Sequence, residues 1–173
     1  MIRPEQQPQW NSEDPETSLV SLWKFLHAQA REMLLEAGTH LEIVFVVSGD
    51  GTVQPQPIAP PLPRDAVADV LREQIPGSSV CGLIHIGEGW AYIPTGKGDH
   101  THKQLILGEM GVSDLNDDDR TEVLASSLLS QGGNRCALLD EIIRPAGGPA
   151  SLGRTILNEN ARFPLGNVLW DVT

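Results

Sequence analysis

One long amphipathic segment, residues 15–37, constrains the fold of this chain more than any other feature. Asp14 and Pro15 are typical of a helix start, as an N-cap aspartate and a proline at the first helical position. Gly38 is predicted to end the helix, and His27 falls on its polar side. Apolar residues recur every three or four positions and form one stripe: Leu19, Leu22, Trp23, Leu26, Ala30, Met33, Leu34 and Ala37. A single stripe predicts a helix that packs one side against a core.

Most of the remaining apolar sequence favours β-strands. Three runs are rich in apolar and β-branched residues and are bounded by turn residues: 41–48, 80–93 and 135–144. Residues 52–58 are predicted to return from the first run as a hairpin arm. Because Pro55 and Pro57 cannot donate to a ladder, that arm should be an edge strand.

Residues 121–130 have two interpretations. They follow three aspartates and precede two glycines, which is compatible with a helix. We favour a strand because the following run is strand-like and needs a partner for pairing. A second helix is predicted over residues 64–74. The fold class is therefore α+β, an antiparallel sheet of about five strands with two helices on one face, in the order α-β-β-α-β-β-β. That order is similar to roadblock- or profilin-like sensor and scaffold domains.

The length and composition predict one domain. A chain of 173 residues with 40% hydrophobic and 20% charged residues is typical of a globular protein with a real core. Residues 1–14 are expected to form a loose arm and residues 15–145 the domain itself. Residues 146–173 are expected to pack back on it as an extension, through apolar residues between 165 and 170.

The charge balance bears on partners. Twelve basic and 23 acidic residues give a formal charge of −11, which opposes direct binding to nucleic acid. The favoured interpretation of this acidity is solubility, and the alternative is an acidic surface that meets a basic protein partner. No apolar segment is typical of a signal peptide or long enough to span a bilayer, so we expect a cytoplasmic protein with no membrane partner. The two cysteines, Cys81 and Cys136, form no Cys-x-x-Cys pair.

The long polar insertion over residues 94–120 carries a partial metal motif. Asp99, His100 and His102 come first, and Asp114 follows. If the segment is extended, the alternating histidines point the same way and can grip zinc with a carboxylate. The pattern resembles part of the JAMM/MPN metalloprotease motif, which implies a zinc-dependent hydrolase. Ten residues separate His102 from the serine that precedes Asp114, a longer gap than that family has. Two solvated histidines with no cofactor are the default expectation.

A second group of residues suggests binding. Glu88 and Trp90 are two residues apart, so they share one face of a predicted strand, where an acid beside an indole can anchor a partner. A core position for Trp90 is the favoured alternative. The binding candidates continue with the acidic turn and the cation after it: Asp117, Asp118, Asp119 and Arg120. Short stretches around these residues and residues 142–144 resemble a scattered group of uncharacterised bacterial and phage proteins, which brings no known activity.

No convincing catalytic set emerges from the sequence. We therefore expect a non-catalytic protein-binding or accessory domain, such as a bacterial or phage regulatory or antagonist factor, with self-association through a sheet edge as one option. The alternative is the zinc-dependent hydrolase that uses His100 and His102. A third option, mimicry of nucleic acid, requires the acids to gather on one face.

Overall fold

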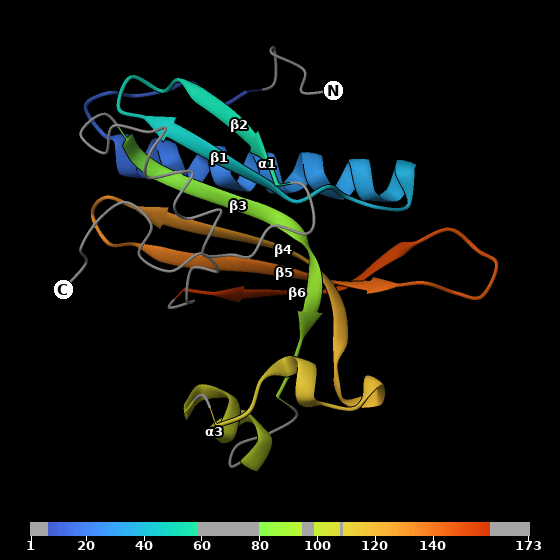
Figure 1. Cartoon of the computed structure of the whole chain (residues 1–173). Helices are drawn as coiled ribbons and strands as arrows, with labels where there is room; N and C mark the ends of the chain where they lie inside the picture. Colours follow the sequence, from blue (N-terminus) through green and yellow to red (C-terminus); the bar gives the residue numbers. More distant parts are fainter. Residues whose placement is uncertain (1–6, 59–79, 95–98, 108, 160–173) are drawn as a thin grey trace.

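The computed structural model describes residues 7–58, 80–94, 99–107 and 109–159, which form one antiparallel sheet with a long helix on one face (Figure 1). The sheet has six strands in the order β2-β1-β3-β4-β5-β6. The helices and strands follow the chain as α1 (Pro15–Ala37), β1 (Ile43–Ser48), β2 (Val53–Pro57), β3 (Val80–Ala91), α3 (His100–Leu107), β4 (Thr121–Ser130), β5 (Arg135–Ile143) and β6 (Ser151–Asn158). The predicted α+β class is confirmed, with six strands in place of about five.

Helix α1 begins and ends as the sequence predicts. The side chain of Asp14 accepts a hydrogen bond from the backbone N–H of Thr17 at 3.2 Å. At the other end Gly38 adopts a left-handed conformation with a φ of 77°, and its N–H donates to the Leu34 carbonyl at 2.8 Å. At each end of α1, a hydrogen bond to a neighbouring residue thus pairs a backbone group near the cap.

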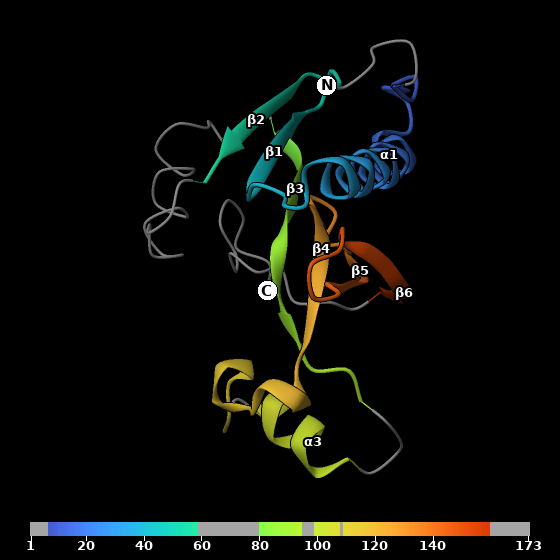
Figure 2. The ribbon, with the colours of Figure 1, turned by 90° about the vertical axis from the view of Figure 1, so that its right-hand side faces the viewer.

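The apolar stripe of α1 packs on one face of the sheet, which Figure 2 shows edge-on with the helix to one side. The core between the two layers consists of buried residues from both: Leu19, Leu22, Trp23, Leu26, Ala30, Leu34, Phe45, Val47, Ile84, Ile86, Leu124, Leu128 and Ile142. Strand residues one position away point to the opposite face, and they too are buried at Val44, Val46, Leu83, Val123 and Leu129. The central strands are therefore buried on both faces.

Residues 121–130 are a strand, as favoured over the helix. β4 pairs with β3 along its whole length and with β5 on its other side. The turn into β5 has Gly133 at a φ of 88°, a backbone conformation that suits glycine. β6, which the sequence does not predict, pairs with β5 and makes the second sheet edge.

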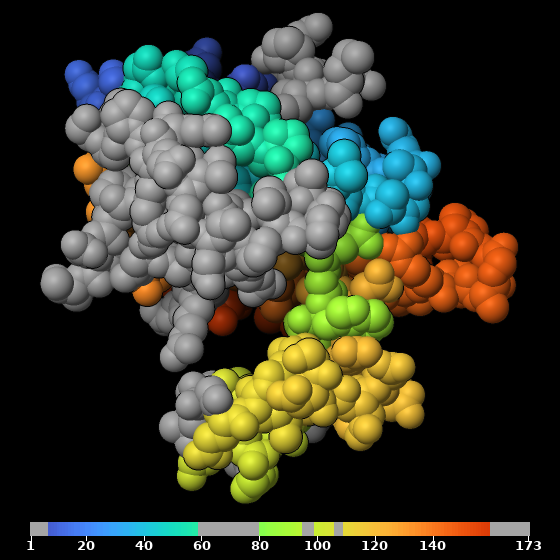
Figure 3. Space-filling model, viewed as in Figure 1, coloured from blue at the N-terminus to red at the C-terminus, as the bar shows by residue number. Residues whose placement is uncertain are grey.

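A projection leaves the sheet between its two central strands. β3 and β4 stay paired up to Ala91 and Thr121, and the chain between them lies beyond the end of the sheet (Figures 1 and 3). It contains α3 and two short 3-10 helices, η3 (Val112–Asp114) and η4 (Asp117–Asp119). We call residues 99–107 and 109–120 the distal lobe.

Trp10 attaches the described part of the N-terminal arm to the turn between β1 and β2. The indole N–H of Trp10 donates to the Gly49 carbonyl at 3.1 Å, and its ring packs against Gly51 in the β1–β2 turn. The predicted helix over residues 64–74 and the apolar residues between 165 and 170 lie outside the described residues. No described helix is long and apolar enough to cross a membrane.

Candidate functional site

The candidate site lies where the sheet extends past the last turn of α1. Glu88 and Trp90 follow Ile86 on the helix-facing side of β3, and Glu122 on β4 is paired directly with Trp90. Because α1 ends at Ala37, the helix covers Ile86 and leaves the next positions open at its end. Glu88 and Trp90 therefore share one face, as the sequence predicts.

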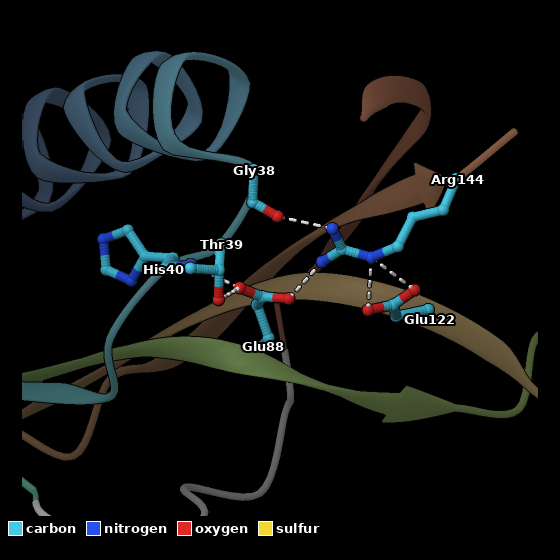
Figure 4. Close-up of polar contacts among 6 residues, drawn as sticks. All are labelled: Gly38, Thr39, His40, Glu88, Glu122 and Arg144. Atoms are coloured by element: carbon cyan, nitrogen blue, oxygen red, sulfur yellow. Dashed lines mark hydrogen bonds and ion pairs between the residues drawn. The ribbon is translucent and has the colours of Figure 1, made fainter. Parts of the chain in front are cut away.

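Arg144, just after β5, joins the end of α1 to the two central strands (Figure 4). Its Nε donates to both carboxylate oxygens of Glu122 at 3.0 Å. One terminal nitrogen donates to Glu88 and the other to the Gly38 carbonyl. Hydrogen bonding to Glu122, with the charge of both carboxylates, raises the pKa of the Arg144 guanidinium. A cation at the last carbonyls of α1 also interacts favourably with the helix dipole.

Both carboxylate oxygens of Glu88 accept hydrogen bonds in this network. Oε2 accepts from Arg144, while Oε1 accepts from the Thr39 hydroxyl at 2.8 Å and from the backbone N–H of His40. Its side chain is 18% exposed. Glu88, a predicted binding residue, thus fixes the chain that leaves α1, and we assign it a positioning role in the site.

Trp90 is not a core residue. It is 51% exposed, so the favoured core interpretation of the sequence is wrong. The physical reason is the length of α1, which ends before it can cover this position. The guanidinium carbon of Arg120 lies 4.7 Å from the centroid of the indole ring, a cation–π contact. Sequence reasoning named both residues and did not predict their contact.

The acidic turn provides the partner of that arginine. Arg120 forms an ion pair with Asp117, whose side chain is 83% exposed. Asp118 and Asp119 are also exposed, and Asp119 accepts a hydrogen bond from the Asn116 side chain at 3.1 Å. The Nε atom of Arg120 is buried and has no hydrogen-bond partner among the described residues.

The predicted metal residues lie in the distal lobe, in a different geometry from the one expected. His100 and His102 are on helix α3, so the extended segment assumed for them is wrong, and side chains two apart on a helix do not face each other. Asp99 accepts from the backbone N–H of His102 at 3.2 Å and from the Tyr92 hydroxyl. Asp114 accepts from the Gly111 N–H at 2.7 Å. Within the described ranges, no three histidine, cysteine or acidic residues gather as a metal site would require.

A buried polar cluster under α1 was not predicted. Asp140 on β5 has no exposed surface, and its Oδ2 lies 2.9 Å from Nε2 of His27 and 3.4 Å from Nε of Arg31. Thr155 on β6 donates to its other oxygen. His27 is buried, so its predicted place on the polar side of the helix is wrong. Burial lowers the pKa of His27, an effect that the charge of Asp140 opposes.

Comparison with known proteins finds no match among family models, curated proteins or solved structures. The fold and the residues of the site therefore carry the functional argument.

Proposed function

We propose that this protein is a non-catalytic module that binds another protein, and that Trp90 and the acidic distal lobe receive a basic segment of that partner. The observation that carries the proposal is the half-exposed indole of Trp90 near the end of β3, where the strand leads into the acidic distal lobe. Tryptophan is enriched among the residues that dominate binding energy at protein interfaces.

The charge of the lobe supports a basic partner. Its described residues include six carboxylates, against Lys103 and Arg120 as its only lysine or arginine side chains. The whole chain has a formal charge of −11. Such a surface attracts a positively charged segment over a distance and speeds its association.

The Arg144 network supports the same site by making its base rigid. Arg144 ties the end of α1 to Glu88 and Glu122, and these flank Trp90 along its own strand and across the pair. An anchor on a well-packed strand is held more firmly than one on a loop, so less conformational freedom is lost on binding. The alternative zinc-dependent hydrolase gains no comparable support from the positions of His100 and His102 on α3. We propose that the protein acts as an accessory or antagonist factor in a bacterium or phage.

The proposal is tested by affinity capture from lysate of the source cells with quantitative mass spectrometry. The baits are the wild-type chain, Trp90→Ala, and a triple variant with asparagine at positions 117, 118 and 119. A matched triple variant, with Glu13, Glu32 and Glu36 changed to glutamine, removes the same charge from other exposed positions. We expect a basic protein that is retained by the wild type and the matched control and lost by the two site variants.

The captured protein is then produced alone and titrated at two salt concentrations, because attraction between exposed charges weakens with salt. Equal binding by all four baits, or binding that does not change with salt, would contradict the proposal. Light scattering on the same samples tests self-association separately.

A further inference from the structure

The contact between Arg120 and Trp90 suggests how the proposed binding site is regulated, an inference that rests on the proposed function. A guanidinium over an indole face is the same contact that a partner's arginine would make on an exposed tryptophan. Arg120 therefore already occupies one face of the anchor in the unbound protein.

The bonding of Arg120 is incomplete. The guanidinium has five N–H donors, yet its Nε is buried without a hydrogen-bond partner among the described residues. Arg120 forms an ion pair with Asp117, whose side chain is 83% exposed, so water and salt weaken the attraction. A buried donor without a partner costs free energy, so this arrangement is a poor one for a purely structural arginine.

The position of Arg120 in the chain favours its release. It follows the short helix η4 and precedes the first residue of β4, so no strand pairing fixes it. When its side chain leaves the ring, the strand pair from Ala91 and Thr121 onward stays in place. Asp117, Asp118 and Asp119 remain beside the site and supply carboxylates for an incoming cation.

We infer that Arg120 is an internal competitor for the Trp90 site, and that an arginine side chain of the basic partner displaces it from the indole face. The ligand class is an arginine-containing peptide segment, recognised by the indole and by the carboxylates of the acidic turn. Arg120 lowers the affinity of the unbound site, and its displacement is part of the binding step.

The probe is a synthetic, acetylated peptide of alternating glycine and arginine, titrated into the full chain by calorimetry at low salt. Arg120→Gln keeps the length of the side chain and removes its charge. Lys103→Gln is the matched control. Lys103 is an exposed cation of the same lobe, and among the described residues it is Arg120 that lies over the Trp90 ring. Trp90→Leu and the double variant Trp90→Leu/Arg120→Gln complete a thermodynamic cycle.

We expect Arg120→Gln to bind the peptide about two- to fivefold more tightly than the wild type, the range that an exposed cation–π contact represents. Lys103→Gln should give a smaller gain. In the Trp90→Leu background the gain from Arg120→Gln should shrink to that of Lys103→Gln. Peptides with lysine in place of arginine should bind more weakly, and those with glutamate should not bind.

Four outcomes would overturn the inference: weaker binding by Arg120→Gln, a gain no larger than that of Lys103→Gln, a gain that persists without the indole, or no measurable binding by either wild type or Arg120→Gln. The proposed function is judged separately by the captured partner. If that partner binds and is lost by Trp90→Ala, while Arg120→Gln binds it no more tightly than Lys103→Gln, the inference falls and the proposed function stands.

Discussion

Asp140 on β5 is a fully buried carboxylate whose partners come from two other elements. His27 and Arg31 approach it from α1, and Thr155 reaches it from the last strand. Removing the carboxylate would leave the buried His27 imidazole without its hydrogen-bond partner, which is costly. The cluster therefore links the helix to the edge of the sheet through one side chain.

Replacing Asp140 by alanine should lower the free energy of unfolding by about 1–3 kcal/mol, because the buried His27 imidazole loses its hydrogen-bond partner. Urea unfolding followed by circular dichroism measures the loss. Asp118→Ala removes an exposed carboxylate and serves as the control, with an expected change within about 0.5 kcal/mol. Equal losses in the two variants would contradict this account.

The stability of the protein should fall in mild acid because His27 is buried. Its pKa is lowered from the ordinary value of 6.5, as is that of His40, and burial is the main cause for both. The unfolded chain therefore takes up protons on these residues at a higher pH than the folded chain. The contribution of these two histidines to the free energy of unfolding is fully present above a pH of about 6.5. It is lost as the pH falls toward their lowered pKa values.

His27→Gln should flatten this pH dependence, because one of the two histidines with a lowered pKa, His27 and His40, is then absent. Urea unfolding at several pH values between about 5 and 7.5 measures the slope. His102→Gln, at an exposed position of the lobe, should leave the slope unchanged. A slope in His27→Gln equal to that of the wild type would refute the assignment.

Along β3, two glycines differ in what surrounds them. A Cβ atom at Gly82 would lie 2.3 Å from Cδ2 of Leu19, so the buried Leu19 side chain of α1 fills the space beside this glycine. At Gly89 a Cβ atom would have no neighbour within 4 Å. The first glycine makes room for the Leu19 side chain, and the second has open space beside it.

We expect Gly82→Ala to destabilise the protein by about 1–3 kcal/mol through overpacking. Gly89→Ala is a matched control on the same strand and should be neutral or slightly stabilising, since glycine weakens strands. Thermal unfolding of both variants compares them directly. A neutral Gly82→Ala would show that α1 can shift away from β3 without loss.

The Arg144 network attaches the end of α1 to β3 and β4. Arg144→Ala removes the cation at the Gly38 carbonyl and leaves Glu88 and Glu122 without the charge between them. The expected loss of unfolding free energy is about 1–2 kcal/mol, since the side chain is partly exposed. Arg154→Ala, at an exposed position of β6, is the control. Arg144→Lys should recover only part of the loss, because a lysine cannot bond Glu122 with the planar fork of arginine.

The sequence is sufficient for elements whose signals are local. The caps and stripe of α1 and the apolar runs of the central strands predict them closely. β6 was missed because its short, mostly exposed sequence becomes a strand only through pairing with β5. α3 was missed because alternating histidines suggested an extended segment.

The site was only partly accessible from the sequence. Residue type and spacing predicted Glu88, Trp90 and Arg120 as binding candidates, and their part in binding stays a prediction. The role of Arg144 depends on residues 22 to 106 positions away, and such distances leave no local signal. The exposure of Trp90 depends on where α1 ends above the sheet, which a strand pattern alone does not reveal.

For the whole molecule, we expect the body, which consists of α1 and the six strands, to fold without the distal lobe. The core between α1 and the sheet contains no residue of the lobe. We expect a chain in which residues 93–119 are replaced by Asn-Gly, a favoured two-residue hairpin turn, to retain cooperative unfolding and the circular dichroism of the sheet. It should lose the captured partner. Loss of folded structure would instead show that the lobe is needed for the sheet.

The strands that lead into the lobe are the two at the centre of the sheet. Local opening of a sheet starts most easily at its margins, which here are β2 and β6. A partner bound to the distal lobe would contact the segment that joins these two central strands, and its binding free energy would add to the free energy of global unfolding. Binding at the distal lobe would then slow amide hydrogen exchange in the buried central strands, far from the point of contact.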